Sequence, residues 1–506
     1  MANIIAAVGI EQALQRAIVP VDLAFDPLEA LALWPESEPL TCLISARAGS
    51  AEAARWSRWS VLAAPTGVLR CWANEAGGAC RSEWVALEPG AHCPVALGDD
   101  PIEMIGAAAR ATADGVHDPD HGGLPFAGGW LASVSYDAGR LIEPRALAQA
   151  RDGPGARRDR DWPLVELWRC PGALVHDGLK GKWWAVGERA AIPGLEQHAA
   201  RAGRSRIGTM KSLTGRRGYE ESVERALELI RAGDIFQANI AHRISARFHG
   251  SARGLARRLL AHSGAWYGAY LESPGANGLE RAVCSASPEL FLKVDGATRR
   301  IVTRPIKGTI AAEEGSTALL ASEKNRAELT MITDLMRNDV GRICEYGSVR
   351  VDEARAAERH GARAGAQRGA GVYHTVATVS GMLRRDVTVG TMLRATFPPG
   401  SVTGAPKIRA MQVIDALEPV QRGMYCGSIG FISDAGDSCW NVAIRTASLS
   451  LEPGSTAAGA RGVLDYSVGA GIVADSRPDE EWRETLHKAG VLRAAVARPR
   501  RAGARR

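Results

Sequence analysis

A lysine in the stretch TRPIKGT is the first residue whose setting suggests chemistry. Lys307 stands between a proline-stiffened extended segment and a glycine, which leaves three readings open: a solvated loop charge, a point charge that holds an anion, or a nucleophile. A free lysine side chain has a pKa of about 10.4 and is protonated at neutral pH. An amine can attack a substrate only if burial or a nearby cation lowers that pKa by about two or three units.

Carboxylates on two predicted helices could bind a metal ion together. Glu481 and Glu484 in PDEEWRETLHKAGVLRAAV are spaced i, i+3, and Lys488 follows at i+7, so that all three project from one helical face. Glu328 lies on or near the edge of the apolar stripe of SEKNRAELTMITDLMRND. Mg2+ takes oxygen ligands and commonly binds through one or two carboxylates plus the anions of a substrate, so Glu328 and Glu484 would suit it if they converge. Taken singly, each is more simply a solvated charge or a partner of the helix dipole.

Three further residues have side chains suited to acid–base chemistry or anion binding. Glu289 in SASPELF precedes an apolar strand, and burial there would raise its pKa as a general acid requires; an edge-strand glutamate facing water is the alternative. His374 in GVYHTVATVSG lies on an alternating strand, where a structural histidine is the alternative. Arg445 in VAIRTAS interrupts an apolar strand and is suited to a fixed carboxylate, or to an internal salt bridge.

Two glycine-rich turns could bring backbone close to a ligand. FPPGSVTGAPKIRAM enters a helix and offers backbone N–H groups to an anion. In VGAGIVADS, Gly469 and Gly471 would let the chain approach a ligand. Neither turn matches a dinucleotide-binding or Walker motif, and both also fit a purely topological role.

The elements that must position these residues alternate between strands and helices. Short apolar runs in the first 200 residues suit an antiparallel sheet. Helices are predicted at 219–232, 322–339, 405–417 and 478–496, with strands between them, which favours an α+β fold over a doubly wound parallel sheet. Segments 151–161 and 352–371, and the Arg-rich tail from about residue 493, are predicted to be surface loops or a frayed end.

Composition narrows the class of protein. The 506 residues are 46% hydrophobic and 23% charged, as in a soluble globular protein, and neither a leader nor a membrane-spanning run is apparent, so we expect a cytoplasmic location and no membrane. Nine cysteines without CxxC spacing predict reduced thiols. The formal charge of +6 equals the six arginines of the last fourteen residues, so it gives no support for a nucleic-acid partner.

Taken in order, these segments resemble the chorismate-utilising enzymes. The similarity is greatest to component I of aminodeoxychorismate synthases, with component I of anthranilate synthases next. It covers roughly residues 210–495 and continues faintly through SRWSVLAAP and PFAGGWLASVSYDAG. The motifs that carry it are FQANIAHR, SASPELF, TRPIKGT, NRAELTMITDLMRNDVGR, FPPGSVTGAPKIRAMQVIDALEP, YCGSIGF, AIRT and GAGIVADSRPDEEWRETLHKA.

The resemblance implies a fold and a set of roles. The fold is α+β, with two antiparallel β-sheets packed as a sandwich and helices outside; an N-terminal region, 1–200, is interleaved with the chorismate-binding region, 210–495, and a tail, 496–506, follows. Glu328 and Glu484 would bind Mg2+ with support from Glu481, Glu289 would assist departure of the 4-hydroxyl of chorismate, and His374 would be the active-site histidine. The positions implied to hold the substrate are Gln237, Thr309, Tyr425, Arg445, Gly469, Gly471 and Lys488.

Two positions separate the reactions within the family. Gln237 stands where the water-adding members carry a lysine base, and Lys307 fills a position that is alanine in anthranilate synthases. The resemblance therefore implies that Lys307 adds at C2 of chorismate and that ammonia then enters at C4, giving 4-amino-4-deoxychorismate on the route to p-aminobenzoate and folate. Since the chain lacks a GxCxGxQ motif, ammonia would come from a separate glutamine amidotransferase subunit. Anthranilate synthase component I is the alternative, and tryptophan binding by the N-terminal part stays open.

Overall fold

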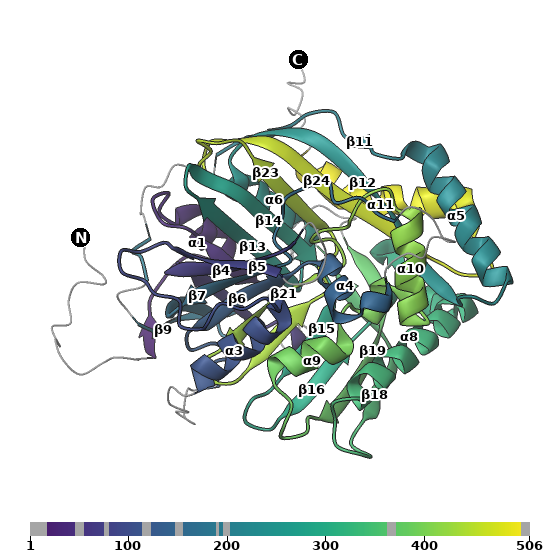
Figure 1. Ribbon diagram of the computed structural model, residues 1–506, viewed down its shortest axis with the longest axis horizontal. Helices are drawn as coiled ribbons and strands as arrows, with labels where there is room; N and C mark the ends of the chain where they lie inside the picture. The colour runs from purple at the N-terminus through teal and green to yellow at the C-terminus, as the bar shows by residue number, and fades with distance from the viewer. Residues whose placement is uncertain are drawn as a thin grey trace.

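Two large antiparallel sheets form the body of the protein. The computed structural model describes residues 18–45, 55–74, 80–113, 123–146, 155–188, 192–195, 203–361 and 371–496. Within these residues the sheets pack face to face over a shared apolar core, and helices lie outside them (Figure 1). The predicted α+β sandwich is confirmed.

Sheet A, as we call the larger sheet, has thirteen strands among the described residues. Their order is β1 (Val19–Val21), β9 (Lys182–Gly187), β8 (Gly172–Asp177), β3 (Trp59–Ala63), β2 (Thr41–Ile44), β13 (Tyr267–Gly275), β14 (Gly278–Ser287), β23 (Thr446–Leu451), β24 (Ala460–Ile472), β12 (Gln237–Gly250) and β10 (Ser205–Ile207), with β11 (Lys211–Ser212) and β20 (Gly404–Ala405) also on β12.

Sheet B, the smaller sheet, has eleven strands among the residues that the structure describes. Their order is β17 (Ile306–Ala311), β19 (Val372–Met382), β16 (Arg300–Arg304), β15 (Leu290–Val294), β22 (Ser438–Asn441), β21 (Ser428–Ser433), β6 (Gly129–Val134), β7 (Val165–Cys170), β4 (Gly67–Ala73) and β5 (Cys80–Ala86), with β18 (Arg350–His360) also on β19. Strands from the first 200 residues pair with later ones in both sheets, β2 with β13 and β6 with β21.

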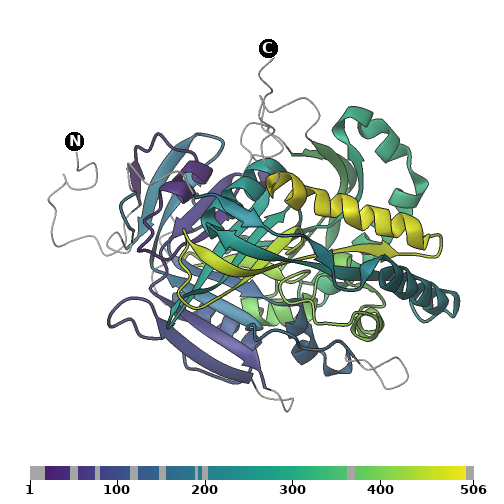
Figure 2. The same ribbon diagram turned by 90° about the horizontal axis from the view of Figure 1, so that it is seen from above.

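The helices cover the sheets, and two of them carry the acidic residues of the candidate site. They are α1 (Pro27–Leu33), α3 (Pro101–Ala113), α4 (Gly139–Ile142), α5 (Gly215–Arg231), α6 (Ala252–Ser263), α7 (Ser316–Ala321), α8 (Glu323–Gly341), α9 (Val389–Thr396), α10 (Lys407–Leu417) and α11 (Pro478–Val496). Ser322 caps α8 by accepting a hydrogen bond from the backbone N–H of Asn325. The long helix α11 packs on β24 and on both α5 and α6 (Figure 2).

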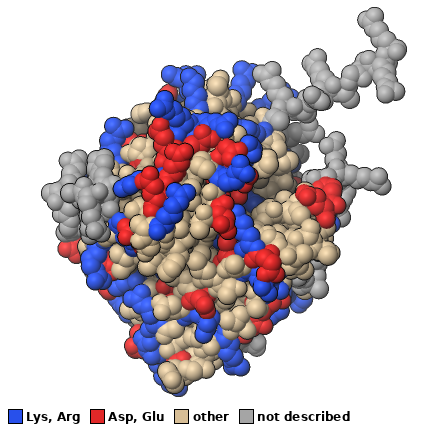
Figure 3. Space-filling view, turned by 90° about the vertical axis from the view of Figure 1, so that its right-hand side faces the viewer, with Lys and Arg blue, Asp and Glu red and all other residues tan. Residues whose placement is uncertain are grey.

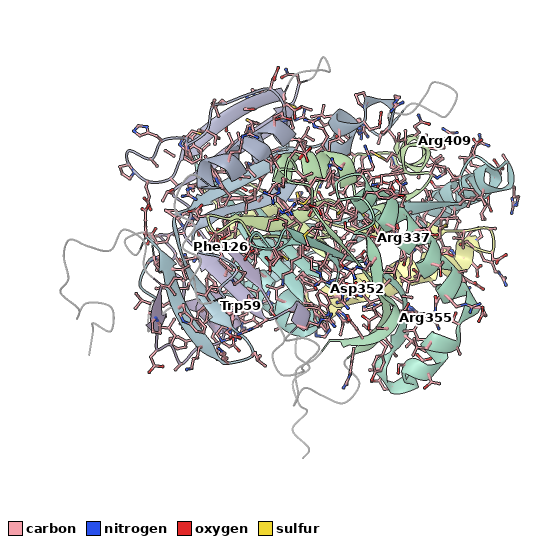
Figure 4. The ribbon with its side chains drawn as sticks, turned by 90° about the horizontal axis from the view of Figure 1, so that it is seen from below. Trp59, Phe126, Arg337, Asp352, Arg355 and Arg409 are labelled. Carbon is pink, nitrogen blue, oxygen red and sulfur yellow. The ribbon has the colours of Figure 1, made fainter. Side chains whose placement is uncertain are left out.

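The prediction of a surface loop at 352–371 is wrong over its first half. Residues 350–360 form β18, which pairs with β19, and Glu358 and His360 on this strand are buried. The exposed positions of β18 are rich in arginine, alanine and acid, so the strand resembled a loop, although its alternate positions face the protein. Figure 4 marks Asp352 and Arg355 on this strand and Arg337 on the neighbouring α8. Residues 362–370, and most of the predicted tail, lie outside the described residues.

Two further sequence predictions can be compared with the structure. All nine cysteines lie in described segments, and none of them forms a disulfide, as predicted. Among the helices that the structure describes, none combines the length and apolar character needed to cross a membrane. On the side where α5, α8, α10 and α11 lie, acidic and basic side chains are interspersed (Figure 3).

Candidate active site

Strands from both sheets bring Lys307, Gln237 and Gly471 together. A Cβ atom placed on Gly471 of β24 would lie 2.8 Å from Nζ of Lys307 and 3.1 Å from Nε2 of Gln237. The pairing of β12 with β24 brings Gln237 close to Gly471. Asn239 lies opposite Gly471, and Gln237, two residues earlier, is the first residue of β12. Only a residue without a side chain leaves room for the lysine here.

The side-chain amide of Gln237 is buried without a hydrogen-bond partner. The residue is 0% exposed, and neither Nε2 nor Oε1 is bonded to any group in the described residues. Unpaired buried amides are rare because each costs the full desolvation of its polar atoms. An amide of this kind beside a lysine and a glycine indicates a place for a polar ligand.

Lys307 is not a solvated loop charge. Its side chain is 13% exposed, and Nζ lies 3.5 Å from Oε2 of Glu328 on α8. Gly308, which follows it at φ +71°, packs against the amide of Asn325 on the same helix. The sheet edge and the helix together therefore fix the direction of the amine.

Two of the three acidic residues predicted to hold a metal pair with lysines, Glu328 with Lys307 and Glu484 with Lys488. Lys488 lies 2.7 Å from Glu484 on α11, and this neighbour lowers the pKa of the Glu484 carboxyl. The positive field of Lys307 also reaches Glu484. Glu481 is buried, and burial raises the pKa of its carboxyl.

These carboxylates do not form a closed ligand cluster. No group of three metal-binding side chains is assembled anywhere in the part of the chain that the structure describes. Glu328 and Glu484 nevertheless fit Mg2+ by their donor chemistry, because both carboxylates offer hard oxygen ligands.

Glu289 has the environment of a general acid. It is 3% exposed, and burial raises the pKa of its carboxyl to about 7. The hydroxyl of Ser401 donates a 2.6 Å hydrogen bond to Oε1 of Glu289 and partly opposes that rise. Sequence reasoning missed Ser401, although it lies in the glycine-rich turn already selected and a hydroxyl among prolines and glycines was the available signal.

His374 is held as a neutral imidazole with a defined tautomer. Its Nε2 lies 3.3 Å from Nη2 of Arg445, and a guanidinium can only donate, so Nε2 accepts. The proton therefore sits on Nδ1, which donates to Oγ1 of Thr309 at 2.9 Å. Burial, with help from neighbouring cations, holds the pKa of His374 well below its usual value. Arg445 adopts φ +53°, which is unusual for a residue other than glycine and typical of functional sites.

Tyr425, Gly469 and Lys488 form the remaining part of the site. Nζ of Lys488 donates to the carbonyl oxygen of Gly469 at 2.7 Å, and a Cβ on Gly469 would lie 2.9 Å from Oη of Tyr425. The prediction that Gly469 and Gly471 lie in a turn is wrong, because both are strand residues of β24. Glycine serves close packing against side chains here rather than a change of chain direction.

Comparison with known proteins identifies the family. Residues 71–494 match the family described as chorismate binding enzyme. The chain belongs to the chorismate-binding enzymes. As a member of this family it is an enzyme that acts on chorismate, which its sequence motifs had indicated.

Aminodeoxychorismate synthase and anthranilate synthase are both among the names of the similar proteins. Aminodeoxychorismate synthase component 1 of Escherichia coli (strain K12) is 34% identical over 404 residues, covering 77% of this chain and 81% of that protein. The anthranilate synthase component I-like protein of Synechocystis is 33% identical over 398 residues, covering 75% and 74%. The crystal structure of anthranilate synthase component I from Streptococcus pneumoniae TIGR4 aligns with a TM-score of 0.66 and 28% identity, covering 86% of this chain and 92% of that one.

Proposed function

We propose that this chain converts chorismate and ammonia to 4-amino-4-deoxychorismate, on the route to p-aminobenzoate and folate. The observation that carries the proposal is the position of the Lys307 amine beside Gly471 and the unpaired amide of Gln237. An amide cannot take a proton from water, whereas a lysine at this position offers a nitrogen nucleophile.

The chemistry divides into two displacements. Nζ of Lys307 adds at C2 of chorismate while the 4-hydroxyl leaves, and Glu289 supplies the proton that makes water the leaving group. Ammonia then adds at C4, the bond between C2 and Nζ breaks, and the lysine is released. The buried Glu289 is suited to the first step because its carboxyl, with a pKa of about 7, still holds its proton near neutrality.

Other residues of the chain hold the substrate. Arg445 and Lys488 present cationic groups to its carboxylates, and Tyr425 and the backbone at Gly469 and Gly471 complete the binding positions. Thr309 acts through His374, whose neutral ring it orients.

Glu328 and Glu484 would hold Mg2+, with Glu481 supporting them from the same helix as Glu484. Bound there, the ion would neutralise a substrate carboxylate. Each carboxylate now faces a lysine, so the ion would take over charges that Lys307 and Lys488 balance in its absence.

Ammonia would come from a separate glutaminase subunit. The chain carries no GxCxGxQ motif, and the Escherichia coli relative is named as component 1, which supports a second component. The chain alone should therefore use ammonium salts but not glutamine.

Anthranilate synthase is the second candidate, favoured by the names of the Synechocystis and Streptococcus relatives. Mass spectrometry of the products from purified protein, chorismate, Mg2+ and ammonium separates the two. The proposal predicts 4-amino-4-deoxychorismate, and anthranilate as the sole amine product would overturn it.

A further inference from the structure

Behind His374 lies a second buried histidine that no motif identified. His360, the last residue of β18, is 1% exposed. Its ring stacks on Trp266, with centroids 4.2 Å apart and planes inclined by 23°, and meets the ring of His374 at 5.0 Å and 73°. The active-site histidine therefore packs against another imidazole rather than against an aliphatic core.

A buried carboxylate accompanies this second histidine. Glu358 lies directly opposite His374 in the pairing of β18 with β19, and its Oε2 is 3.6 Å from Nε2 of His360. Because Glu358 and His360 are two residues apart on a strand, both face the same side as His374. Each neighbouring strand thus places a polar residue opposite His374 in the register: Thr309 on β17 and Glu358 on β18.

The carboxylate is itself fixed in place. Arg304 of β16 forms a buried ion pair with Glu358 and donates to Oγ1 of Thr378 at 3.1 Å. The guanidinium of Arg304 also stacks on Trp56, 4.0 Å from the ring centroid. Because Arg304 is itself held by Thr378 and Trp56, its ion pair keeps the carboxylate of Glu358 in a fixed position.

Arg445 and Thr309 fix which nitrogen of His374 carries the proton, but two hydrogen bonds in the ring plane leave the ring free to tilt out of that plane. The edge-to-face contact with His360 is what restricts this tilt. We propose that Glu358 and His360 are positioning residues that keep the ring of His374 in the orientation in which Thr309 and Arg445 hold its neutral Nδ1–H tautomer, with Nε2 directed at Arg445 and the substrate. Of the measurements that test this proposal, only the kinetic one rests on the proposed function.

The charges around His374 support this assignment. The groups that face it are His360 from β18, Arg445, Lys488 from α11, and Thr309 with the Gly308 carbonyl from β17. Burial contributes most to the low pKa of His374, His360 contributes next and Arg445 after it, while the Gly308 carbonyl acts in the opposite direction. Removing His360 therefore makes protonation of His374 easier.

The test uses nitrogen NMR of histidine-labelled full-length protein, with the His374 signals assigned from a His374→Gln variant. His360→Phe keeps an aromatic ring on Trp266 but removes the polar nitrogens, and Glu358→Gln keeps the shape of the side chain but removes its charge. His176→Gln is the matched control, because His176 is also a buried histidine packed on a tryptophan, Trp183, but in sheet A at β8 and β9.

In the wild-type protein we expect a single neutral Nδ1–H form of His374 throughout the neutral pH range. In both His360→Phe and Glu358→Gln we expect a mixture of His374 tautomers and a fall in kcat of about tenfold or more, the scale of losing a partner that orients a histidine. In His360→Phe, protonation of His374 should also occur at higher pH, because the cationic form of His360 no longer opposes it. Should His360→Phe fail to fold, Glu358→Gln gives the same readout with the ring stack intact. An Nε2–H form in the wild type, or unchanged His374 signals and pH profile in the folded variants, would overturn the proposal whatever product the enzyme makes.

Discussion

The amine of Lys307 lies 3.5 Å from a carboxylate oxygen of Glu328, and both side chains are withdrawn from solvent, with 13% and 15% exposed. Strand β17 supplies the amine and helix α8 supplies the carboxylate. This contact joins the proposed nucleophile to the proposed metal site. A change at one of the two residues therefore affects the other, and variants must separate charge from nucleophilicity.

Two replacements of Lys307 distinguish its positive charge from its role as a nucleophile. Lys307→Ala should lower the rate of amination by at least about a hundredfold, the scale of losing one catalytic group. Lys307→Arg should be equally inactive, because it keeps the positive charge beside Glu328 but a guanidinium does not deprotonate to a nucleophile. Steady-state rates with chorismate and ammonium measure both. If Lys307→Arg aminates at the wild-type rate, the lysine acts only as a charge.

Gly471 should tolerate no side chain. In Gly471→Ala the new Cβ would lie 2.8 Å from Nζ of Lys307, so the amine must move and amination should fall by at least about tenfold, as small misplacements of reacting groups do. Gly490→Ala on α11 is the matched control, since a Cβ there meets nothing within 4 Å. That control should keep its activity and gain about 0.5–1 kcal/mol in the free energy of unfolding, because alanine suits a helix interior better. Equal activity of the two variants would contradict the position given to Lys307.

The pH dependence of kcat/KM should reflect the protonation state of the Glu289 carboxyl. A general acid works only while it holds its proton, and burial places the pKa of this carboxyl at about 7, so kcat/KM should fall as pH rises above that value. Ser401→Ala removes a hydrogen bond that favours the ionised carboxyl, so the pKa should rise and the fall should begin at higher pH. Ser438→Ala, a buried serine of β22 whose hydroxyl has no partner among the described residues, should leave the profile unchanged. A shift to lower pH in Ser401→Ala would exclude Glu289 as the titrating acid.

We expect amination to require Mg2+ and Glu484 to be one of the residues that bind it. A chelator should abolish turnover, and Glu484→Gln should raise the Mg2+ concentration for half-maximal rate by at least about tenfold, because one of two anionic ligands is lost. Glu480→Gln, on the same helix but paired with Arg477 rather than Lys488, changes the net charge equally and should have no such effect. Two variants with the same Mg2+ requirement would remove Glu484 from the metal site.

Most helices and strands could be predicted from the sequence, whereas the contacts between them could not. Helices α8 and α11 were predictable because a serine cap and apolar stripes are local signals. That Lys307 meets Glu328 and Gly471 depends on the packing of a strand edge, a helix and a second sheet, which no local pattern encodes. Glu358 and His360 were missed because a strand with one arginine- and alanine-rich face resembles a loop, and Ser401 because its bond to Glu289 joins residues far apart in the chain.

The position at which nitrogen enters the substrate tests the central claim most directly. Purified protein would be incubated with chorismate, Mg2+ and isotopically labelled ammonium, and nitrogen–carbon couplings in the product would be read by NMR. We predict the label on C4 of an intact, pyruvyl-bearing ring, as double displacement through Lys307 requires. Label on C2, with the pyruvyl group lost, would contradict the account.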